Sequence, residues 1–266
     1  MKHIYKVLLT RLTGIRRKLF LLPAAALLVN GCGGTEEEFD LNRNIREAYI
    51  DAQEAVEVGN YRKAVGTFEA LQARFPFSQF ATQIQLELSY AYYKDSRPEQ
   101  AIDAADTFIR ENPTHSRVDY AMYIKGLAYF ESGQSFLERL FRKDINKRPP
   151  RDGELAFSTL SRMVERYPAS PYAADAQQRL VYLKNRLAAY ENAVAQFYLE
   201  REAYIAALNR AKTAIEVYQG ADSGAESLRI IIEAYEGLGM NKLANDTRRV
   251  LEKNFSSTQS NPIVYN

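Results

Sequence analysis

A regular spacing between small residues and helix-ending residues constrains the fold of this chain more than any other feature. Pro76 and Pro113 are 37 residues apart, and an alanine lies 12 residues before each of them. The same offset of 12 recurs in later units, where Gln219 once takes the place of the proline. The alanines at this place in the pattern are Ala64, Ala101, Ala156, Ala207 and Ala244. Since small residues let two helices cross closely and proline ends a helix, the spacing predicts repeated pairs of antiparallel helices.

The repeat predicts an all-α fold, an α-solenoid of about five tetratricopeptide-like helix pairs over residues 44–254. Few glycines and prolines interrupt the periodic segments, and the abundant Ala, Leu, Glu and Arg residues are strong helix formers. One helix pair cannot bury its apolar face alone, so the pairs must stack on one another. We expect the units near residues 45–78, 82–115, 119–170, 188–221 and 225–254, with a long helix that starts near Ala173 and runs through Glu200.

The third unit carries an insert at residues 133–152, between its two helices. This insert holds six basic residues and three acidic ones, together with an apolar strip of Phe136, Leu137, Leu140 and Phe141. A segment that docks on a partner or on the membrane fits this pattern, and so does a loop folded against its own repeat.

The N-terminus has the layout of a lipoprotein signal peptide, which we place at residues 1–31. Six basic residues and no acidic residue precede the apolar stretch from Leu19 to Val29, and the chain's only cysteine, Cys32, follows at once. Eleven residues rise about 16 Å as a helix, too little for a hydrocarbon core of about 30 Å. Residues 29–32 are similar to a bacterial lipobox, although Asn30 fits it poorly.

The lipobox implies that Cys32 carries an S-diacylglycerol and an N-acyl chain, which would anchor the mature protein to a membrane. An ordinary secreted protein with a free thiol is the alternative. Gly33 stands where an aspartate favours retention in the inner membrane of enteric bacteria, so transport to the outer membrane is expected. Residues 32–43 have no apolar periodicity and are interpreted as a flexible tether. Residues 255–266 form a polar tail that we expect to be disordered.

Charge and motif content argue against nucleic-acid binding and against catalysis. Removal of residues 1–31 leaves 29 basic and 33 acidic residues, whereas nucleic-acid-binding domains present a basic face. His115 is the one histidine of the mature chain, and it lies in a turn beside Pro113. The sequence contains no phosphate-binding loop, no nucleophile elbow and no His/Cys cluster with metal-ligand spacing. We therefore expect no enzyme activity, no metal and no cofactor other than the covalent lipid on Cys32.

An aromatic groove is predicted on the first helices of units one to three. In a stacked array these helices line the concave face, and their inward positions are rich in tyrosine. An aromatic surface with a nearby cation suits an apolar peptide that ends in a carboxylate. Packing of the same tyrosines between helices is the alternative. The candidate groove residues are Tyr49, Leu86, Tyr90, Tyr93, Lys94, Tyr120, Tyr123 and Leu127.

Several stretches together resemble one family of envelope proteins. They include Arg74-Phe75-Pro76-Phe77, Tyr90-Ala91-Tyr92-Tyr93-Lys94, Asn112-Pro113-Thr114-His115 and the pairs Glu200-Arg201 and Asn209-Arg210. With the lipobox, they are similar to the BamD family, lipoproteins of the bacterial outer-membrane β-barrel assembly machinery. The resemblance covers nearly the whole mature chain, and the insert and the tail match least well.

The resemblance implies a location, partners and contact residues. Family members sit on the periplasmic face of the outer membrane and bind the periplasmic domains of BamA through their C-terminal repeats. By this likeness, Arg201 and Arg210 are expected to contact BamA. The N-terminal repeats of family members engage unfolded outer-membrane β-barrel proteins, and other Bam lipoproteins join the complex in some bacteria. Another envelope scaffold of the same repeats, for pilus-secretin assembly or murein binding, is the alternative.

Overall fold

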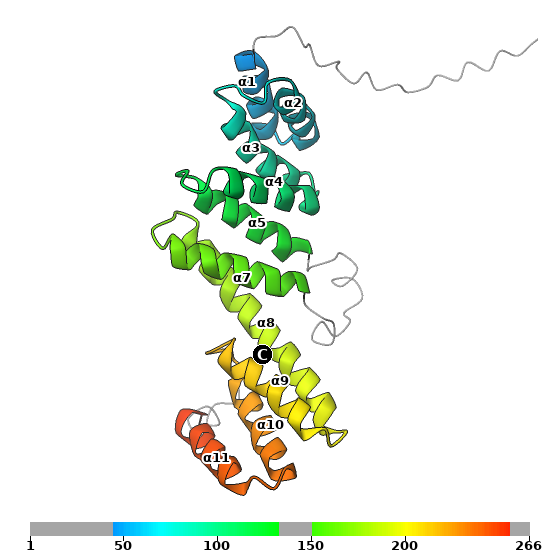
Figure 1. Ribbon diagram of the computed structural model, residues 1–266, viewed down its shortest axis with the longest axis vertical. Helices are drawn as coiled ribbons and strands as arrows, with labels where there is room; N and C mark the ends of the chain where they lie inside the picture. Colours follow the sequence, from blue (N-terminus) through cyan, green and yellow to red (C-terminus); the bar gives the residue numbers. More distant parts are fainter. Residues whose placement is uncertain (1–44, 133–150, 256–266) are drawn as a thin grey trace, which may run out of the picture. The chain divides into compact units, whose positions relative to one another are not determined.

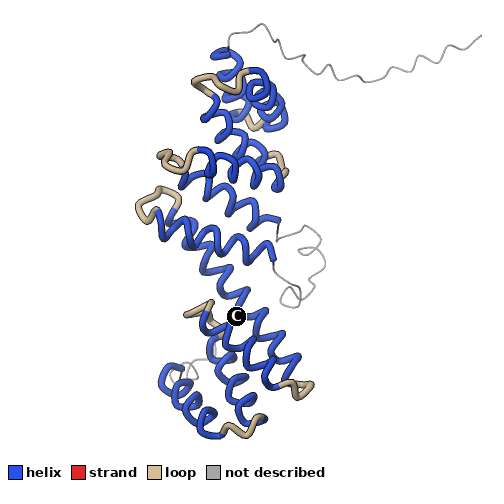
Figure 2. The backbone as a smooth tube through the Cα atoms, in the orientation of Figure 1, coloured by secondary structure: helices blue, strands red, loops and turns tan. Residues whose placement is uncertain are grey.

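The computed structural model describes residues 45–132 and 151–255, and all secondary structure in these two ranges is α-helical (Figures 1 and 2). The helices are α1 (Ile45–Glu57), α2 (Tyr61–Arg74), α3 (Ala81–Lys94), α4 (Pro98–Glu111), α5 (Val118–Ser132), α7 (Arg151–Arg166), α8 (Ala173–Leu199), α9 (Tyr204–Glu216), α10 (Gly224–Gly237) and α11 (Asn241–Phe255). None of the helices in these ranges is long and apolar enough to cross a membrane.

The helices form five tetratricopeptide-like pairs, which confirms the predicted fold class. α1 packs on α2, α3 on α4, α5 on α7, α8 on α9, and α10 on α11, and each pair also contacts the next. The five alanines of the repeat pattern, on α2, α4, α7, α9 and α11, are all buried at these crossings. At the crossing of α5 and α7, Gly126 lies so close to Leu160 that a Cβ atom would stand 2.4 Å from the leucine Cδ2.

Turn residues set where the helices begin and end. The Asn60 side chain accepts a hydrogen bond from the Lys63 backbone N–H and so caps α2. Gly59, just before it, has a φ of +79°, a conformation that glycine adopts without strain. Pro98 occupies the first turn of α4, where the missing N–H of proline costs nothing.

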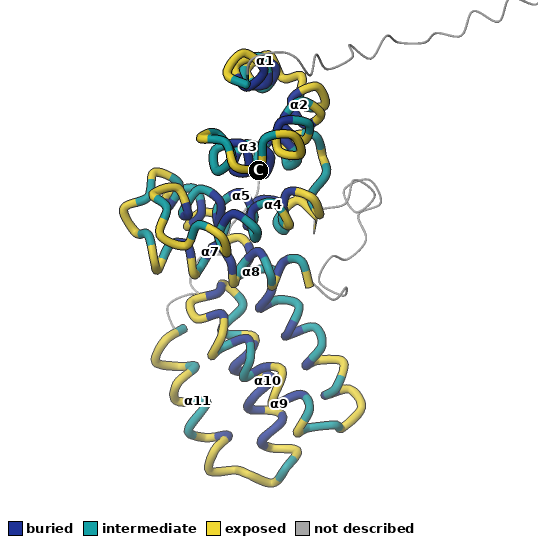
Figure 3. The backbone as a smooth tube through the Cα atoms, turned by 45° about the horizontal axis from the view of Figure 1, so that its top comes forward, coloured by how far each residue is buried: buried dark blue, intermediate teal, exposed yellow. Residues whose placement is uncertain are grey.

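Three apolar clusters fill the space between the helices. The N-terminal cluster lies around Phe68 and Ile84, and the middle one contains Leu86, Phe108 and Leu160. The C-terminal cluster joins α8 to α9, α10 and α11. α8 takes part in two of the clusters, because its first half packs in the middle cluster and its last turns pack in the C-terminal one. α11 has a single buried residue and is mostly exposed in Figure 3.

Two predicted boundaries differ from the structure by a few residues. Arg151 and Asp152, expected in the insert, form the first turn of α7, and Phe255, expected in the tail, is the last residue of α11. Helical periodicity in α7 begins with the buried Gly153 and Ala156, so one preceding turn carries no apolar signal. The signal peptide, Cys32, the tether to residue 43, residues 133–150 of the insert and residues 256–266 of the tail lie outside the described residues.

Candidate functional site

Five tyrosine rings follow one another across the first three helix pairs, and we name this set the tyrosine ladder. The ring centroids of Tyr61 and Tyr90 are 6.4 Å apart, and those of Tyr90 and Tyr120 are 6.5 Å apart. Tyr172 lies 5.1 Å from Tyr120 and stacks on Tyr123 at 4.9 Å. All five side chains are partly exposed. Rings from α2, α3, α5 and the turn before α8 thus make one aromatic surface.

Two cations border the tyrosine ladder. The exposed Lys94 places its Nζ atom 5.4 Å from the Tyr61 ring centroid, and the guanidinium carbon of Arg117 lies 4.7 Å from that of Tyr120. Both distances allow cation–π attraction, which holds a cation over the ring face without neutralising it. The ladder is therefore an aromatic surface with two cations at its edge, and the Glu87 carboxylate also acts on Tyr90 and Tyr120, whose pKa values it raises.

Burial raises the pKa of three hydroxyl groups of the ladder, so these three stay protonated at neutral pH. Burial raises the pKa of Tyr123 to about 12, and the hydrogen bond that its hydroxyl donates to Asp175 acts in the same direction. Burial likewise raises the pKa of Tyr120 and of Tyr90. The same Oδ2 atom of Asp175 also accepts a hydrogen bond from the Nε atom of Arg179 at 2.6 Å. The surface consequently offers neutral rings and hydroxyl groups.

The structure brings five of the eight predicted groove residues together. Tyr90, Tyr120 and Tyr123 belong to the ladder, and Lys94 lies beside it. Tyr93, one residue before Lys94, donates a hydrogen bond from its hydroxyl to Glu131 at 2.5 Å.

The prediction was wrong for Leu86 and Leu127, and Tyr49 lies elsewhere. Leu86 is 0% exposed and fills the middle cluster, and Leu127 is 6% exposed, so neither has surface to offer a peptide. Each sits on a first helix that packs against the helices before and after it, so an apolar residue on it can be covered from either side. Tyr49 is 8% exposed, packs in the N-terminal cluster and stacks on Phe80 at 5.1 Å. Its ring edge reaches a separate open hollow of about 510 Å³ between α1 and the turn before α3.

Sequence reasoning missed Tyr61, Tyr172 and Arg117, because it considered only the first helix of each pair. Tyr61 begins a second helix, and Tyr172 precedes α8 in a turn. A signal was present for Tyr172. The turn Ser170-Pro171-Tyr172-Ala173 repeats the pattern of Ser78-Gln79-Phe80-Ala81, and both place an aromatic residue immediately before a first helix.

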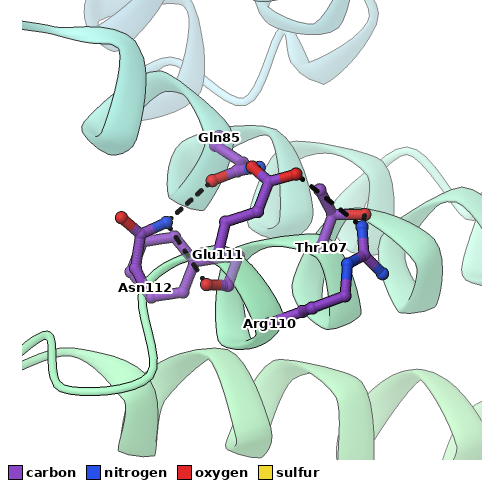
Figure 4. Close-up of polar contacts among 6 residues, drawn as sticks. Gln85, Thr107, Arg110, Glu111 and Asn112 are labelled. Atoms are coloured by element: carbon purple, nitrogen blue, oxygen red, sulfur yellow. Dashed lines mark hydrogen bonds and ion pairs between the residues drawn. The ribbon is translucent and has the colours of Figure 1, made fainter.

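A polar lock holds α3 against the end of α4 behind the ladder (Figure 4). The Nε2 atom of Gln85, a residue only 7% exposed, donates to Glu111 at 2.9 Å. Asn112 donates from Nδ2 to the Gln85 side-chain oxygen at 3.2 Å and to the Phe108 carbonyl at 3.3 Å. Because Gln85 and Tyr90 share α3, these bonds help to fix the helix that carries the ladder ring.

The two arginines expected at a partner interface lie at α8 and α9 but do not contact each other. The Arg201 guanidinium stacks on the Phe197 ring at 3.5 Å and donates to the Phe197 carbonyl at 2.9 Å. Phe197 is 49% exposed and Ile205, in the first turn of α9, is 64% exposed. Arg210 instead reaches Glu191 on α8. The α8–α9 surface thus combines exposed apolar groups with two cations.

Within residues 45–132 and 151–255, no group of three or more His, Cys, Asp or Glu side chains is placed to bind a metal ion. His115 packs its ring against Phe108 and accepts a hydrogen bond at Nδ1 from the Arg117 backbone N–H.

The fold is that of a helical-repeat protein. Residues 42–251 match the family model YfiO, described as outer membrane lipoprotein, and the chain belongs to this family. A relative from Neisseria meningitidis is 40% identical over 90% of this chain and 91% of its own length. Relatives from Vibrio cholerae and Haemophilus influenzae are 39% and 32% identical, over 78% and 91% of this chain and 86% and 92% of their own lengths. All three bear the name outer membrane protein assembly factor BamD.

Solved structures give only distant matches. A crystal structure of MamA protein has a TM-score of 0.38 and 16% identity, over 83% of this chain and 98% of that chain. At that distance the match says nothing about what this chain binds.

Proposed function

We propose that this protein is a non-catalytic assembly factor for outer-membrane β-barrel proteins. It binds unfolded barrel proteins on the tyrosine ladder and docks on the periplasmic domains of BamA through the α8–α9 surface. The observation that carries the proposal is the continuous ladder of five rings in a chain that belongs to the outer membrane lipoprotein family. The names of the relatives indicate the process, which is outer membrane protein assembly, and the ladder offers a surface for the substrate of that process.

The chemistry of the ladder suits an extended, aromatic-rich peptide. Tyrosine rings provide large contact areas at a low cost in side-chain entropy, and their hydroxyl groups can bond to an exposed peptide backbone. A barrel protein that ends in an aromatic residue presents a ring and a terminal carboxylate together. Lys94 or Arg117 would pair with that carboxylate while the ring packs on Tyr90 or Tyr120.

Peptide binding to the mature protein tests this role. A fluorescent peptide that ends in phenylalanine with a free carboxylate should bind, and its C-terminal amide should bind more weakly. Tyr90→Ala and Tyr120→Ala should each weaken binding by roughly tenfold, since an aromatic pair contributes about 0.5–1.5 kcal/mol beyond its buried area and tenfold is about 1.4 kcal/mol. Tyr182→Ala, which removes a 46% exposed tyrosine outside the ladder, is the matched control. Equal affinity for all four proteins would refute the ladder as the substrate site.

The α8–α9 surface supports docking on BamA through complementary chemistry. The exposed Phe197 and Ile205 provide apolar contact, and Arg201 and Arg210 provide cations for carboxylates on the partner. Titration of the mature protein with the purified periplasmic domains of BamA should show a complex, and Arg210→Ala should weaken it. Lys63→Ala, a change on α2, is expected to leave the affinity unchanged.

We further propose that Cys32 carries the lipid anchor and holds the protein at the periplasmic face of the outer membrane. The lipobox-like residues 29–32 and the family description support this placement. Other Bam lipoproteins are proposed as additional partners on the same grounds, and no nucleic acid is involved.

A further inference from the structure

The ion pair between Arg210 and Glu191 is unequal in its exposure. The Nη1 atom of Arg210 lies 3.3 Å from each carboxylate oxygen of Glu191. The Arg210 side chain is 46% exposed, whereas that of Glu191 is 5% exposed. In the part of the chain that the structure describes, the Nε and Nη2 atoms of Arg210 make no hydrogen bond. Glu191 thus binds one nitrogen of the guanidinium, and the other two nitrogens can donate to another molecule.

Glu191 is itself held in place by its neighbourhood on α8. The next residue, Asn192, is 1% exposed and accepts a hydrogen bond at Oδ1 from Ser227 Oγ at 2.8 Å. Its Nδ2 atom donates to the Ser223 carbonyl at 3.2 Å. These bonds tie the middle of α8 to α10 and to the turn before it, so the position of the Glu191 backbone is fixed by two helices.

The buried carboxylate of Glu191 is stabilised by the positive charge of Arg210. Burial raises the pKa of Glu191, Arg210 lowers it, and Glu154 on α7 raises it further. Tyr190 and Tyr198 on α8 and Tyr218 after α9 are the other titratable groups that interact with this pair. Because an unpaired buried carboxylate is strongly disfavoured, the pair keeps Arg210 close to α8.

An arginine that is already immobilised in the unbound protein binds a carboxylate more tightly than an arginine whose side chain is mobile. The arginine side chain has many rotamers, and a partner that immobilises it must offset the lost entropy. A guanidinium already fixed through Nη1 has lost that freedom in the unbound protein. Its remaining donors still match the two oxygens of a carboxylate.

We infer that Glu191 is a positioning residue for Arg210, which it holds through Nη1 so that Nε and Nη2 can take a carboxylate of the docking partner. The inference rests on the proposed docking of BamA at the α8–α9 surface. It adds that the surface is prepared before the partner arrives, through a residue that the partner never touches.

A double-mutant cycle tests this role. The mature full chain and its variants Glu191→Gln, Arg210→Ala and the double variant are titrated with the periplasmic domains of BamA by calorimetry. We expect Glu191→Gln to weaken binding by roughly tenfold and Arg210→Ala by at least as much. The double variant should bind as Arg210→Ala does, since Glu191 acts only through Arg210. A residue that merely supported the fold would weaken binding in both backgrounds.

A second variant covers the case in which Glu191→Gln does not fold. Glu191→Asp keeps the charge but withdraws the carboxylate by one methylene, and it should weaken binding in the same Arg210-dependent way. Circular dichroism of each variant reports its folding.

The outcomes distinguish the proposed docking of BamA at Arg210 from the positioning role of Glu191. If Arg210→Ala binds BamA as tightly as the parent protein, the proposed docking at Arg210 fails and the inference fails with it. If Arg210→Ala binds weakly while Glu191→Gln and Glu191→Asp bind as the parent does, docking stands and the inference is overturned. An equal loss from Glu191→Gln with and without Arg210 also overturns it.

Discussion

At the scale of single residues, helix crossings in this fold depend on the absence of side-chain atoms at defined positions. Gly126 faces the fully buried Leu160, and an added methyl group would overlap it. Gly126→Ala should therefore lower the free energy of unfolding by about 1–3 kcal/mol, the usual cost of overpacking. Urea unfolding followed by circular dichroism measures this change.

A second glycine provides the matched control for that substitution. Gly66 lies within α2, and a Cβ atom there would meet nothing within 4 Å. Gly66→Ala should raise the free energy of unfolding by about 0.5–1 kcal/mol, because alanine loses less backbone entropy in a helix. If both substitutions shift stability in the same direction, close packing at Gly126 is not the cause.

The ionisation of Asp175 makes the stability of the folded protein depend on pH. Burial raises the pKa of Asp175, but the hydrogen bonds from Arg179 and Tyr123 outweigh it and bring the pKa below its ordinary value of 3.8. The folded state thus keeps this carboxylate charged to lower pH than the unfolded state does. Its contribution to stability is present above pH 3.8 and is lost as the pH falls through the lower folded value.

The variant Asp175→Asn should show this dependence directly. At neutral pH it should melt below the parent protein, and the difference should shrink once the pH falls below the folded-state pKa of Asp175. Melting curves across the acid range measure both effects. A difference that stays constant with pH would mean that the ionised carboxylate contributes nothing.

At the scale of helices, the sequence allowed the pairing to be predicted but not the exposed face of each helix. The alanine spacing located all five crossings because a close crossing needs a small residue whatever its surroundings. The start of α8 at Ala173 also agreed with the prediction, and its end at Leu199 differed by one residue. Leu86 and Leu127 were assigned wrongly because α3 and α5 pack against helices on two sides. Periodicity reports which residues are apolar, and the order of stacking decides which of them are covered.

The polar lock of α3 and α4 yields a prediction for a helix pair. Gln85→Met keeps the volume of the side chain but removes the hydrogen bonds to Glu111 and Asn112. The free energy of unfolding should fall by about 1 kcal/mol, since the exposed Glu111 can bond to water instead. Gln83→Met is the matched control, because Gln83 bonds to Glu87 on its own helix and to Tyr49 on α1, and neither bond joins α3 to α4. Equal losses from the two substitutions would show that Gln85 has no special part in joining α3 to α4.

At the scale of the whole molecule, α8 connects the two candidate surfaces. Tyr172 of the ladder immediately precedes this helix, Glu191 lies within it, and Phe197 is in its last turn. The helix also belongs to two apolar clusters. The proposed substrate site and the proposed docking surface thus share one continuous element. The partners themselves could be predicted only from family resemblance. The tyrosine ladder and the two arginines, Arg201 and Arg210, indicate a kind of ligand but not its identity.

The proposed anchor on Cys32 would hold these surfaces at a membrane. Several acyl chains on Cys32 would give stable attachment, because each buried CH₂ contributes about 0.8 kcal/mol and a single chain is marginal. Cys32→Ser should therefore abolish palmitate labelling and move the protein from the outer-membrane fraction to the soluble fraction. The purified variant should still bind the phenylalanine-terminated peptide as the parent does, since the ladder lies on α2, α3, α5 and the turn before α8. Palmitate labelling that persists in Cys32→Ser would refute the anchor, and absence of labelling in the parent protein would favour an ordinary secreted protein with a free thiol.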